Sequence, residues 1–394
     1  VWNIILEYKN QSLSSKTITR QMGGIFISLM MAFLMVSDPY KEVYTFQKHS
    51  NRGAKSVLDK TNETSSGTSW QYATQWSFHP KELISFLYPY FYGLQNFSSR
   101  DLKSAAYWGY MPFTQSTHYL GLIALILATL GALLKKPDKI SFFSLITVAL
   151  ILITGFGSYF SLLYKPFFEV FPFFSKFRIP SMIYAMLPVI ISILAARGFD
   201  LLSVVKDKQS FSKVLYVAGG VAILSLILLI ISDSLIDFNS LRDNRYNPST
   251  KTQLKSLRYD LFNKGIILAL ALSISFLLLY YFYYKNKILE SLFSCGIMGL
   301  VIFDLGVLNN EFINVKPKKN MDNMFQKNLI INHLVADTTN FRIFPAEEIS
   351  SNKYSYWNIE SIGGYRPIKL RLYQDLMDAG GFNRSHILDM LNVK

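Results

Sequence analysis

Residues 265–284 read GIILALALSISFLLLYYFYY, a run of twenty positions without a charged side chain. The hydrocarbon core of a bilayer is about 30 Å thick, and a helix needs about 20 apolar residues to cross it. The run therefore predicts a membrane-spanning helix. The rest of the chain has a similar character, because 51% of its 394 residues are hydrophobic and only 17% are charged.

Six more apolar runs resemble this one, so that the sequence predicts an α-helical polytopic membrane protein with about seven spans. The seven runs are 22–36, 119–134, 140–156, 180–196, 214–232, 265–284 and 291–308. The first, second and fourth are short, because about 17 residues is the lower limit for a span. A short apolar run also suits a buried core helix, and for the first run this alternative stays open.

Basic residues in the short loops predict the orientation, because Lys and Arg accumulate in the cytoplasmic loops of membrane proteins. Four segments are rich in Lys and Arg, and in a seven-span topology all four lie on the same side of the membrane. These segments are 9–20, 135–139, 197–213 and 285–287. The N-terminal segment is then cytoplasmic. The regions on the outer side are 37–116, 157–179, 233–264 and 309–394. An even number of spans would reverse the side of the C-terminal region.

The chain accordingly divides into three predicted regions. Residues 1–21 form a cytoplasmic segment, 22–308 form the transmembrane domain, and 309–394 form a small extracytoplasmic α/β module. The module is predicted from short apolar runs that alternate with polar turns, and it is close to the lower size limit of a domain that is stable alone. No initiator methionine or signal peptide precedes Val1, and unpartnered apolar residues reach the C-terminal end. We therefore expect a piece of a longer chain, with the module incomplete.

Two predicted outer segments are rich in aromatic residues. Residues 70–113 follow a polar stretch at 60–69 and contain fourteen Trp, Tyr and Phe side chains. Such rings form the interfacial belt of many membrane proteins, and a platform for a sugar or a polyprenyl chain is the alternative. In 157–179, Pro166 and Pro172 argue against one continuous helix. We expect a re-entrant or interfacial segment there that forms the wall of a cavity.

The composition argues against several classes of function. The net charge of +14 comes without a basic run with interleaved aromatics, so we expect no nucleic-acid partner. Lysines near anionic lipid account for part of the charge. The single cysteine, Cys295, excludes an intramolecular disulfide, and the five histidines show no metal-ligand spacing. Motifs of nucleotide binding, serine hydrolases and metalloproteases are missing from the sequence.

Polar residues at the predicted outer face are candidates for binding or catalysis. Arg178 precedes Pro180 and suits a phosphate held by two N–H groups, and snorkelling to the interface or pairing with an acid is the alternative. Asp38 ends the first span and Glu82 opens an interfacial segment, and each suits a helix terminus as well as a catalytic acid. Asp304 lies near the outer end of the last span, where we expect its carboxylate to reach water.

Eight short motifs follow one another along the chain. They are SNRG at 50–53, FHPKEL at 78–83, YWGYMPF at 107–113, YLG at 119–121, FRIPS at 177–181, SIGGYRPIKL at 361–370, YQDL at 373–376 and LDMLNVK at 388–394. In this order they resemble the bacterial YfhO-like membrane proteins, a family with the GT-C glycosyltransferase architecture. The resemblance covers most of the chain from Arg52 onward.

The resemblance implies a protein of the bacterial cytoplasmic membrane that transfers a sugar from a polyprenyl-phosphate donor to an envelope polymer or glycolipid on the outer face. Families of this architecture place the key acid in the first outer loop of the complete protein, so the catalytic residue is expected outside this chain. The candidate substrate-binding residues are then Asp38, His79, Glu82, Trp108, Arg178, Tyr365, Arg366 and Lys369. The paired glycines before Tyr365 also suit a structural turn. No cofactor and no metal ligand is identified, and use of a divalent metal stays open.

Two other functions stay open beside the transferase. A lipid or polymer transporter is disfavoured because the predicted spans contain few polar residues, whereas translocation pathways usually need ionisable groups at mid-membrane. A scaffold for envelope assembly without catalysis is the other alternative.

Overall fold

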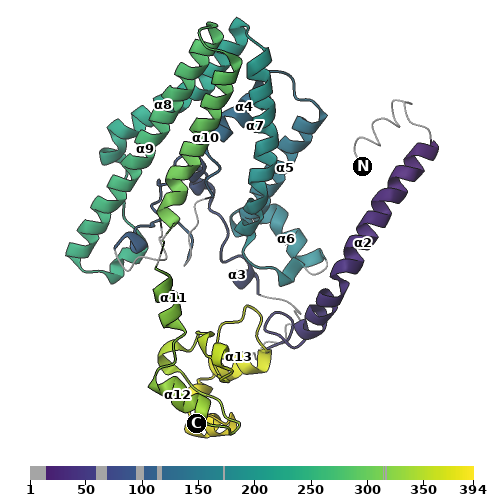
Figure 1. Ribbon diagram of the computed structural model, residues 1–394, viewed down its shortest axis with the longest axis vertical. Helices are drawn as coiled ribbons and strands as arrows, with labels where there is room; N and C mark the ends of the chain where they lie inside the picture. Colours follow the sequence, from purple (N-terminus) through teal and green to yellow (C-terminus); the bar gives the residue numbers. More distant parts are fainter. Residues whose placement is uncertain are drawn as a thin grey trace. The chain divides into compact units, whose positions relative to one another are not determined.

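The computed structural model describes residues 15–58, 69–94, 102–112, 118–171, 174–313, 315 and 317–394. Its regular structure is helical (Figure 1). The chain divides into two compact units, which we call the split unit and the bundle unit. The split unit takes in Val1–Thr68 and Lys318–Lys394, and the bundle unit takes in Ser69–Pro317. The split unit is therefore formed by two segments that the bundle unit separates in sequence.

The bundle unit consists of apolar helices around a short central one. Its main helices are α4 (Leu122–Leu133), α5 (Lys139–Gly155), α7 (Leu187–Val204), α8 (Lys208–Leu235), α9 (Pro248–Tyr284) and α10 (Glu290–Phe312). α6 (Ser161–Val170) and the 3₁₀ helix η5 (Pro180–Met186) come between α5 and α7. α4 packs against α7, α8, α9 and α10, and Leu122, Ile123 and Leu130 on it are fully buried. The apolar core of the unit therefore forms around α4.

Two glycines allow α4 and α7 to approach each other closely. A Cβ atom added at Gly131 would lie 2.2 Å from the carbonyl oxygen of Leu194, and one added at Gly198 would lie 1.9 Å from that of Leu127. Small residues permit such close contact between helices in membrane proteins. The packing of this pair therefore requires glycine at both positions.

Polar residues cap the N-termini of three long helices. The side chain of Asp138 accepts from Ser141 N at the start of α5, and Asp207 caps α8 in the same way through Ser210 N. Asn247 caps α9 through Thr250 N, and a proline takes the first helical position. These side chains satisfy amide groups that have no partner inside the helix. The helices therefore begin where the sequence supplies a cap.

The number of spans differs from the seven predicted. Among the described residues, five segments are helical, long and apolar enough to cross a membrane: Lys16–Asp38, Pro180–Val204, Lys208–Ser232, Pro248–Tyr284 and Glu290–Phe312. α5 and α6 add a sixth if this bent pair counts as one span. α4 is too short, because its 12 residues extend only about 18 Å. The chain is a helical multi-pass membrane protein, and its described residues contain fewer candidate spans than the apolar runs predict.

The segment after α5 bends, as the sequence predicts, but not at a proline. Lys139–Gly155 and Gly157–Val170 meet at 113°, and Gly157 has a φ of +50°. Pro166 lies inside α6. The bend therefore occurs at Gly157, where a backbone angle in the left-handed region favours glycine.

Three of the four basic segments that the sequence assigns to one side of the membrane, 135–139, 197–213 and 285–287, lie at one end of the bundle unit. Arg197 donates to the carbonyl oxygen of Lys136 at 2.9 Å, and Lys213 donates to carbonyl oxygens of the last turn of α4. Lys206 donates to the Oδ1 atom of Asn286 at 3.0 Å. Three loops far apart in sequence therefore meet here. We call this region the basic end.

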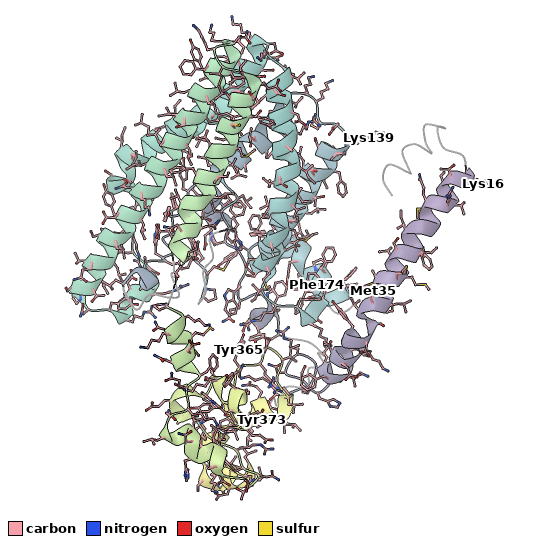
Figure 2. The ribbon with its side chains drawn as sticks, in the orientation of Figure 1. Lys16, Met35, Lys139, Phe174, Tyr365 and Tyr373 are labelled. Atoms are coloured by element: carbon pink, nitrogen blue, oxygen red, sulfur yellow. The ribbon has the colours of Figure 1, made fainter. Side chains whose placement is uncertain are left out.

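The first described element of the split unit is α2 (Ser15–Gln47), whose apolar side chains are largely exposed. Phe33 is 68% exposed and Met35 is 82% exposed, and Figure 2 labels Met35 on this helix. A long helix with an unpartnered apolar surface is typical of contact with lipid. The helix continues nine residues beyond Asp38, so the interpretation of Asp38 as a helix terminator is wrong.

The C-terminal part of the split unit is helical and irregular, not α/β. It contains α11 (Lys318–Met324), α12 (Leu329–Ala336), α13 (Arg371–Asp378) and α14 (Ser385–Met390). Within 317–394 the structure has no strand, and the pairings Arg342↔Val393 and Ile343↔Ser361 are isolated bridges. The 3₁₀ helix η7 (Ala346–Glu348) starts three residues after Ile343, which leaves no length for a ladder. The predicted strands are therefore wrong.

Residues 48–57 complete this part of the split unit. Asn51 N donates to the carbonyl oxygen of Lys369 at 2.8 Å. The Asp375 carboxylate accepts from the Ser56 hydroxyl at 2.6 Å and from Val57 N at 2.8 Å. The segment that follows α2 is thereby bound to α13.

Candidate functional site

The end of α5 away from the basic end is surrounded by aromatic residues, and four candidate residues lie there. Two short elements belong to this region: α3 (Trp70–Ala73) and the 3₁₀ helix η1 (Pro80–Phe86), which contains Glu82 and follows His79. Phe78 N donates to the carbonyl oxygen of Gly155 at 3.0 Å, and Ser158 N donates to the Ser77 hydroxyl at 2.9 Å. These bonds fix the segment between α3 and η1 against the α5–α6 bend. We call this region the aromatic end.

Glu82 is the buried acid of the aromatic end, with 3% of its surface exposed. The Tyr107 hydroxyl lies 3.0 Å from both carboxylate oxygens, and Tyr110 N donates to Oε1 at 2.7 Å. Burial raises the pKa of Glu82, although these two hydrogen bonds and the charge of Arg242 act in the opposite direction. Because it is covered, Glu82 positions Tyr107 and Tyr110 and does not itself present a surface to a ligand.

The ring of His79 stacks on Tyr110, the tyrosine whose backbone N–H donates to Glu82. Its ring centroid is 3.7 Å from that of Tyr110 at an interplanar angle of 10°, and Tyr159 packs edge-on at 4.6 Å. Burial and the nearby charge of Lys81 lower the pKa of His79, so the ring is neutral at pH 7. Nδ1 accepts from Lys81 N at 3.1 Å, which leaves the proton on Nε2. That N–H has no partner among the described residues.

Arg178 is held on the aromatic end by rings and by neutral acceptors. Its guanidinium carbon lies 3.9 Å from the centroid of Tyr72 and 4.2 Å from that of Trp76. It donates to the Tyr72 hydroxyl at 2.7 Å and to Gln75 Oε1 at 3.0 Å. Within the described residues no carboxylate pairs with it. The pairing with an acid that the sequence left open is therefore not seen there.

The backbone next to Arg178 is held in an unusual conformation. Ile179 has a φ of +66°, which is rare for a β-branched residue. Its N–H donates to the carbonyl oxygen of Ala73 at 3.1 Å, and Pro180 then starts η5. Such residues cost about 1–3 kcal/mol and tend to occur at functional sites. The strain fixes the direction in which the Arg178 side chain leaves the chain.

A cavity of about 310 Å³ is lined by one contact residue of Arg178 and one of His79, although neither of these two side chains lines it. Gln75 and Tyr159 line it together with Trp70, Thr74 and Ser158. Gln75 is the acceptor for Arg178, and Tyr159 is the edge-on partner of His79. The cavity therefore joins the surroundings of the arginine to those of the histidine. A second cavity of about 480 Å³ continues beside α6 and shares Trp70 and Ser158 with the first.

Trp108 belongs mainly to the apolar core beneath this surface. Its ring centroid lies 4.7 Å from that of Tyr92 and 5.8 Å from that of Phe238. Its Nε1 atom is buried without a hydrogen-bond partner among the described residues. Trp108 therefore belongs to the apolar core that packs against the aromatic end.

The other candidate residues lie in the split unit. Arg366 and Lys369 line a cavity of about 510 Å³ together with Gly364. The side-chain amide of Asn352 holds the segment before them. Its nitrogen donates to the carbonyl oxygen of Tyr365, and its oxygen accepts from Tyr365 N. Gly364 has a φ of +109°, a backbone angle that favours glycine. Tyr365 is 65% exposed (Figure 2).

Asp38 and Asp304 line none of these three cavities. Asp38 is exposed on α2. Asp304 is fully buried, so the expectation that it reaches water is wrong. Its carboxylate accepts from the Tyr119 hydroxyl and from Ile123 N. Polar groups just before and within α4 thus replace water around it.

A buried ion pair beside the aromatic end was missed by sequence reasoning. Arg258 of α9 bonds both carboxylate oxygens of Asp243, at 2.6 and 2.9 Å. The only local signal is Ser240 three positions before Asp243, which forms a capping box with it. That pattern predicts a helix start but not a partner fifteen residues later.

The described residues contain no group of three or more His, Cys, Asp or Glu side chains that could hold a metal ion. Comparison with known proteins finds no matching family model, no matching curated protein and no matching solved structure.

Proposed function

We propose that this chain binds a polyprenyl-phosphate-linked sugar at the aromatic end and serves its transfer to an envelope polymer or glycolipid. The protein would act in the bacterial cytoplasmic membrane, with the aromatic end on the outer face. The observation that carries the proposal is Arg178, a guanidinium fixed on two aromatic rings and without an acidic partner in the described part of the chain.

The donors of Arg178 suit a phosphate. A guanidinium has five N–H groups, and Tyr72 and Gln75 accept from two of its nitrogens. Both acceptors are neutral, so the positive charge stays uncompensated. Hydrogen bonds between Arg and phosphate are charge-assisted and frequently bidentate. A lipid phosphate that approaches from the interface would supply the missing negative charge.

The surroundings of Arg178 suit the two other parts of such a donor. Trp70 and Tyr159 line the adjoining cavity beside the polar side chains of Gln75 and Thr74. Ring faces pack on the apolar surfaces of sugars and prenyl chains, while hydroxyl and amide groups bond to sugar hydroxyls. The neutral His79 offers one more donor, its Nε2 N–H group. We assign these residues to binding.

The proposed orientation follows from the basic end. Arg197, Lys206 and Lys213 gather there, and such loops normally face the cytoplasm. Cysteine labelling tests this in a Cys295→Ala background, because Cys295 is exposed. A membrane-impermeant maleimide added to intact cells should label Ser158→Cys at the aromatic end. It should label Lys139→Cys at the basic end only after permeabilisation, and the reverse pattern would refute the orientation.

The phosphate role is tested by binding to the purified full chain in nanodiscs. Polyprenyl phosphate should bind more tightly than the matching polyprenol, and Arg178→Ala should abolish most of that preference. A hydrogen-bonded charge contributes about 1.5–3 kcal/mol, so the expected loss is roughly 10- to 160-fold. Arg245→Ala is the matched control, because Arg245 also lies over a tyrosine ring, at 4.8 Å. Nearly equal affinity of the Arg178→Ala variant for polyprenyl phosphate and for polyprenol supports the assignment. An unchanged preference of this variant for polyprenyl phosphate contradicts it.

A further inference from the structure

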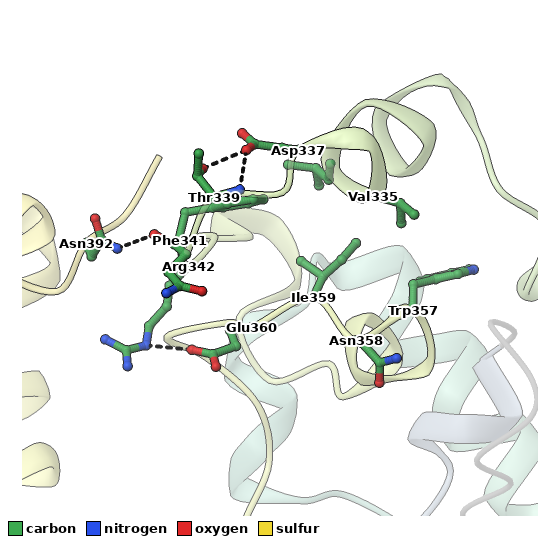
Figure 3. A pocket seen from close by; sticks show the side chains of 12 residues that line it. Val335, Asp337, Thr339, Phe341, Arg342, Trp357, Asn358, Ile359, Glu360 and Asn392 are labelled. Atoms are coloured by element: carbon green, nitrogen blue, oxygen red, sulfur yellow. Dashed lines mark hydrogen bonds and ion pairs between the residues drawn. The ribbon is translucent and has the colours of Figure 1, made fainter.

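A second cleft lies in the split unit and is lined by the end of α12, by Arg342 and by the turn at 357–360 (Figure 3). It has a volume of about 570 Å³, within the roughly 300–1,000 Å³ of small-molecule sites. The residues around it come from the end of α12, from 337–342, from the turn at 357–360 and from Asn392. Its polar lining is made mostly of uncharged amides and of acids that already have partners.

The backbone around this cleft is held on both sides of Arg342. Arg342 N donates to the carbonyl oxygen of Asn392 at 2.8 Å, and Ile343 N donates to that of Glu360 at 2.9 Å. Behind the cleft, Ile343 and Ile359 are buried together with Ile331 of α12. Binding groups held by packing and by backbone bonds keep their geometry better than groups on free loops. The cleft is therefore formed without a ligand.

The charges of this cleft are compensated within the protein. Glu360 pairs with Arg342 at 3.2 Å, and Asp337 pairs with Lys394. Asp337 also accepts from the Thr339 hydroxyl at 2.6 Å and from Thr339 N at 2.9 Å (Figure 3). A cation or an anion would therefore have to compete with an existing ion pair. The lining favours a neutral ligand.

Several polar groups of the lining are left for such a ligand. The side-chain amides of Asn340 and Asn358 and the indole N–H of Trp357 have no hydrogen-bond partner in the described part of the chain. Asn358 has a φ of +58°, a left-handed conformation that asparagine adopts more readily than most residues. Amides offer both donors and acceptors, which match hydroxyl groups. Trp357 adds an aromatic ring to the same turn.

We propose that this cleft binds a neutral saccharide. Amides and compensated acids pair with its hydroxyls, and the Trp357 ring packs on its apolar face. The site lies in the split unit and shares no residue with the aromatic end, so the proposal does not rest on polyprenyl-phosphate binding. The proposal concerns binding of a neutral glycan only, and it does not depend on whether the protein transfers sugars.

Titration of the full chain in nanodiscs with neutral oligosaccharides, using maltohexaose and cellohexaose as probes, tests this. We expect binding of at least one probe with a Kd of about 1 mM or tighter. Asn358→Gly should weaken it at least ten-fold, because glycine keeps the left-handed backbone and removes only the amide. Trp357→Phe keeps an apolar ring beside Ile331, Ile343 and Ile359 and removes the indole N–H, so it should weaken binding as well.

The control is Tyr356→Ala. Tyr356 is 64% exposed and does not line the cleft, but it packs edge-on against Trp357 at 5.4 Å, so its removal should weaken saccharide affinity less than Trp357→Phe does. Arg178→Ala should leave saccharide affinity unchanged, which separates this site from the proposed lipid-phosphate site. Absence of binding by both probes overturns the proposal, and so does equal binding by Asn358→Gly, Trp357→Phe and the unaltered chain. Tighter binding of trigalacturonate than of the neutral probes also overturns it.

Discussion

Removal of either partner of the Arg258–Asp243 pair should destabilise the bundle unit strongly. Only 1% of the Arg258 side chain and 8% of the Asp243 side chain are exposed. Besides the bidentate bond to Asp243, Arg258 donates to the carbonyl oxygens of Ala106 and Phe238 at 3.0 and 2.8 Å. One guanidinium thus joins α9 to three other segments. Asp243→Asn would leave the buried positive charge of Arg258 uncompensated.

The expected size of this effect follows from burial. Loss of one partner of a buried ion pair costs about 3–5 kcal/mol, and each kcal/mol lowers Tm by about 2–4 °C in a domain of this size. Asp243→Asn should therefore lower the unfolding temperature of the detergent-solubilised chain by about 6–20 °C. Arg258→Met, which removes the charge and retains much of the volume, should lower it as well. The double variant should lose less than the sum of the two, because it leaves no buried charge.

Intrinsic fluorescence during heating measures these temperatures. The matched control is Glu169→Ala, which removes the Lys165–Glu169 pair on the surface of α6, where both side chains are more than half exposed. An exposed pair at this spacing contributes only about 0.3–0.5 kcal/mol. If Asp243→Asn shifts the unfolding temperature no more than Glu169→Ala does, or if the single effects add fully in the double variant, the ion pair does not have the role that we assign to it.

Three further outcomes are expected. Gly198→Leu should destabilise the chain by about 1–3 kcal/mol through overpacking, whereas Gly299→Leu, with no atom within 4 Å of an added Cβ, should change the unfolding temperature little. Because burial raises the pKa of Glu82, its contribution to stability is present below its ordinary value of 4.5 and is lost as pH rises through the folded value. Glu82→Gln should therefore reduce the loss of stability as pH rises above that value, and an unchanged pH profile of unfolding would contradict this. Asp375→Ala should release residues 48–57, so that trypsin cleaves after Lys55 sooner, which mass spectrometry of a digestion time course detects.

Apolar runs predicted the positions of the helices but not which of them cross the membrane. Each of the seven runs contains helix, because an uncharged stretch of such length has few other stable structures in lipid. The run 119–134 nevertheless forms a helix of 12 residues, since Gly121 before it has a φ of +87°. The run 22–36 extends to Gln47 through Asp38. The length of an apolar run therefore did not give the ends of these two helices.

The candidate site was predicted in part. The predicted seven-span topology put His79, Glu82 and Arg178 on one outer face, and bonds to the α5–α6 segment bring their surroundings together. The role of Glu82 in holding Tyr107 and Tyr110 could not be read from spacing, because these tyrosines come more than twenty residues later. The strands expected after residue 309 failed for a similar reason. A short apolar run does not reveal whether a pairing partner of equal length exists.

The contact between residues 48–57 and α13 has a consequence for the order of events during synthesis. Ser56 and Asp375 are separated by 319 positions, and the bundle unit lies between them in sequence. At the usual rates of about 5–20 residues per second, a ribosome needs roughly 15–65 s to make that interval. Throughout this time the early segment waits without its partner while helices enter the membrane. The contact between residues 48–57 and α13 therefore forms late, only after the bundle unit between them in sequence has been translated.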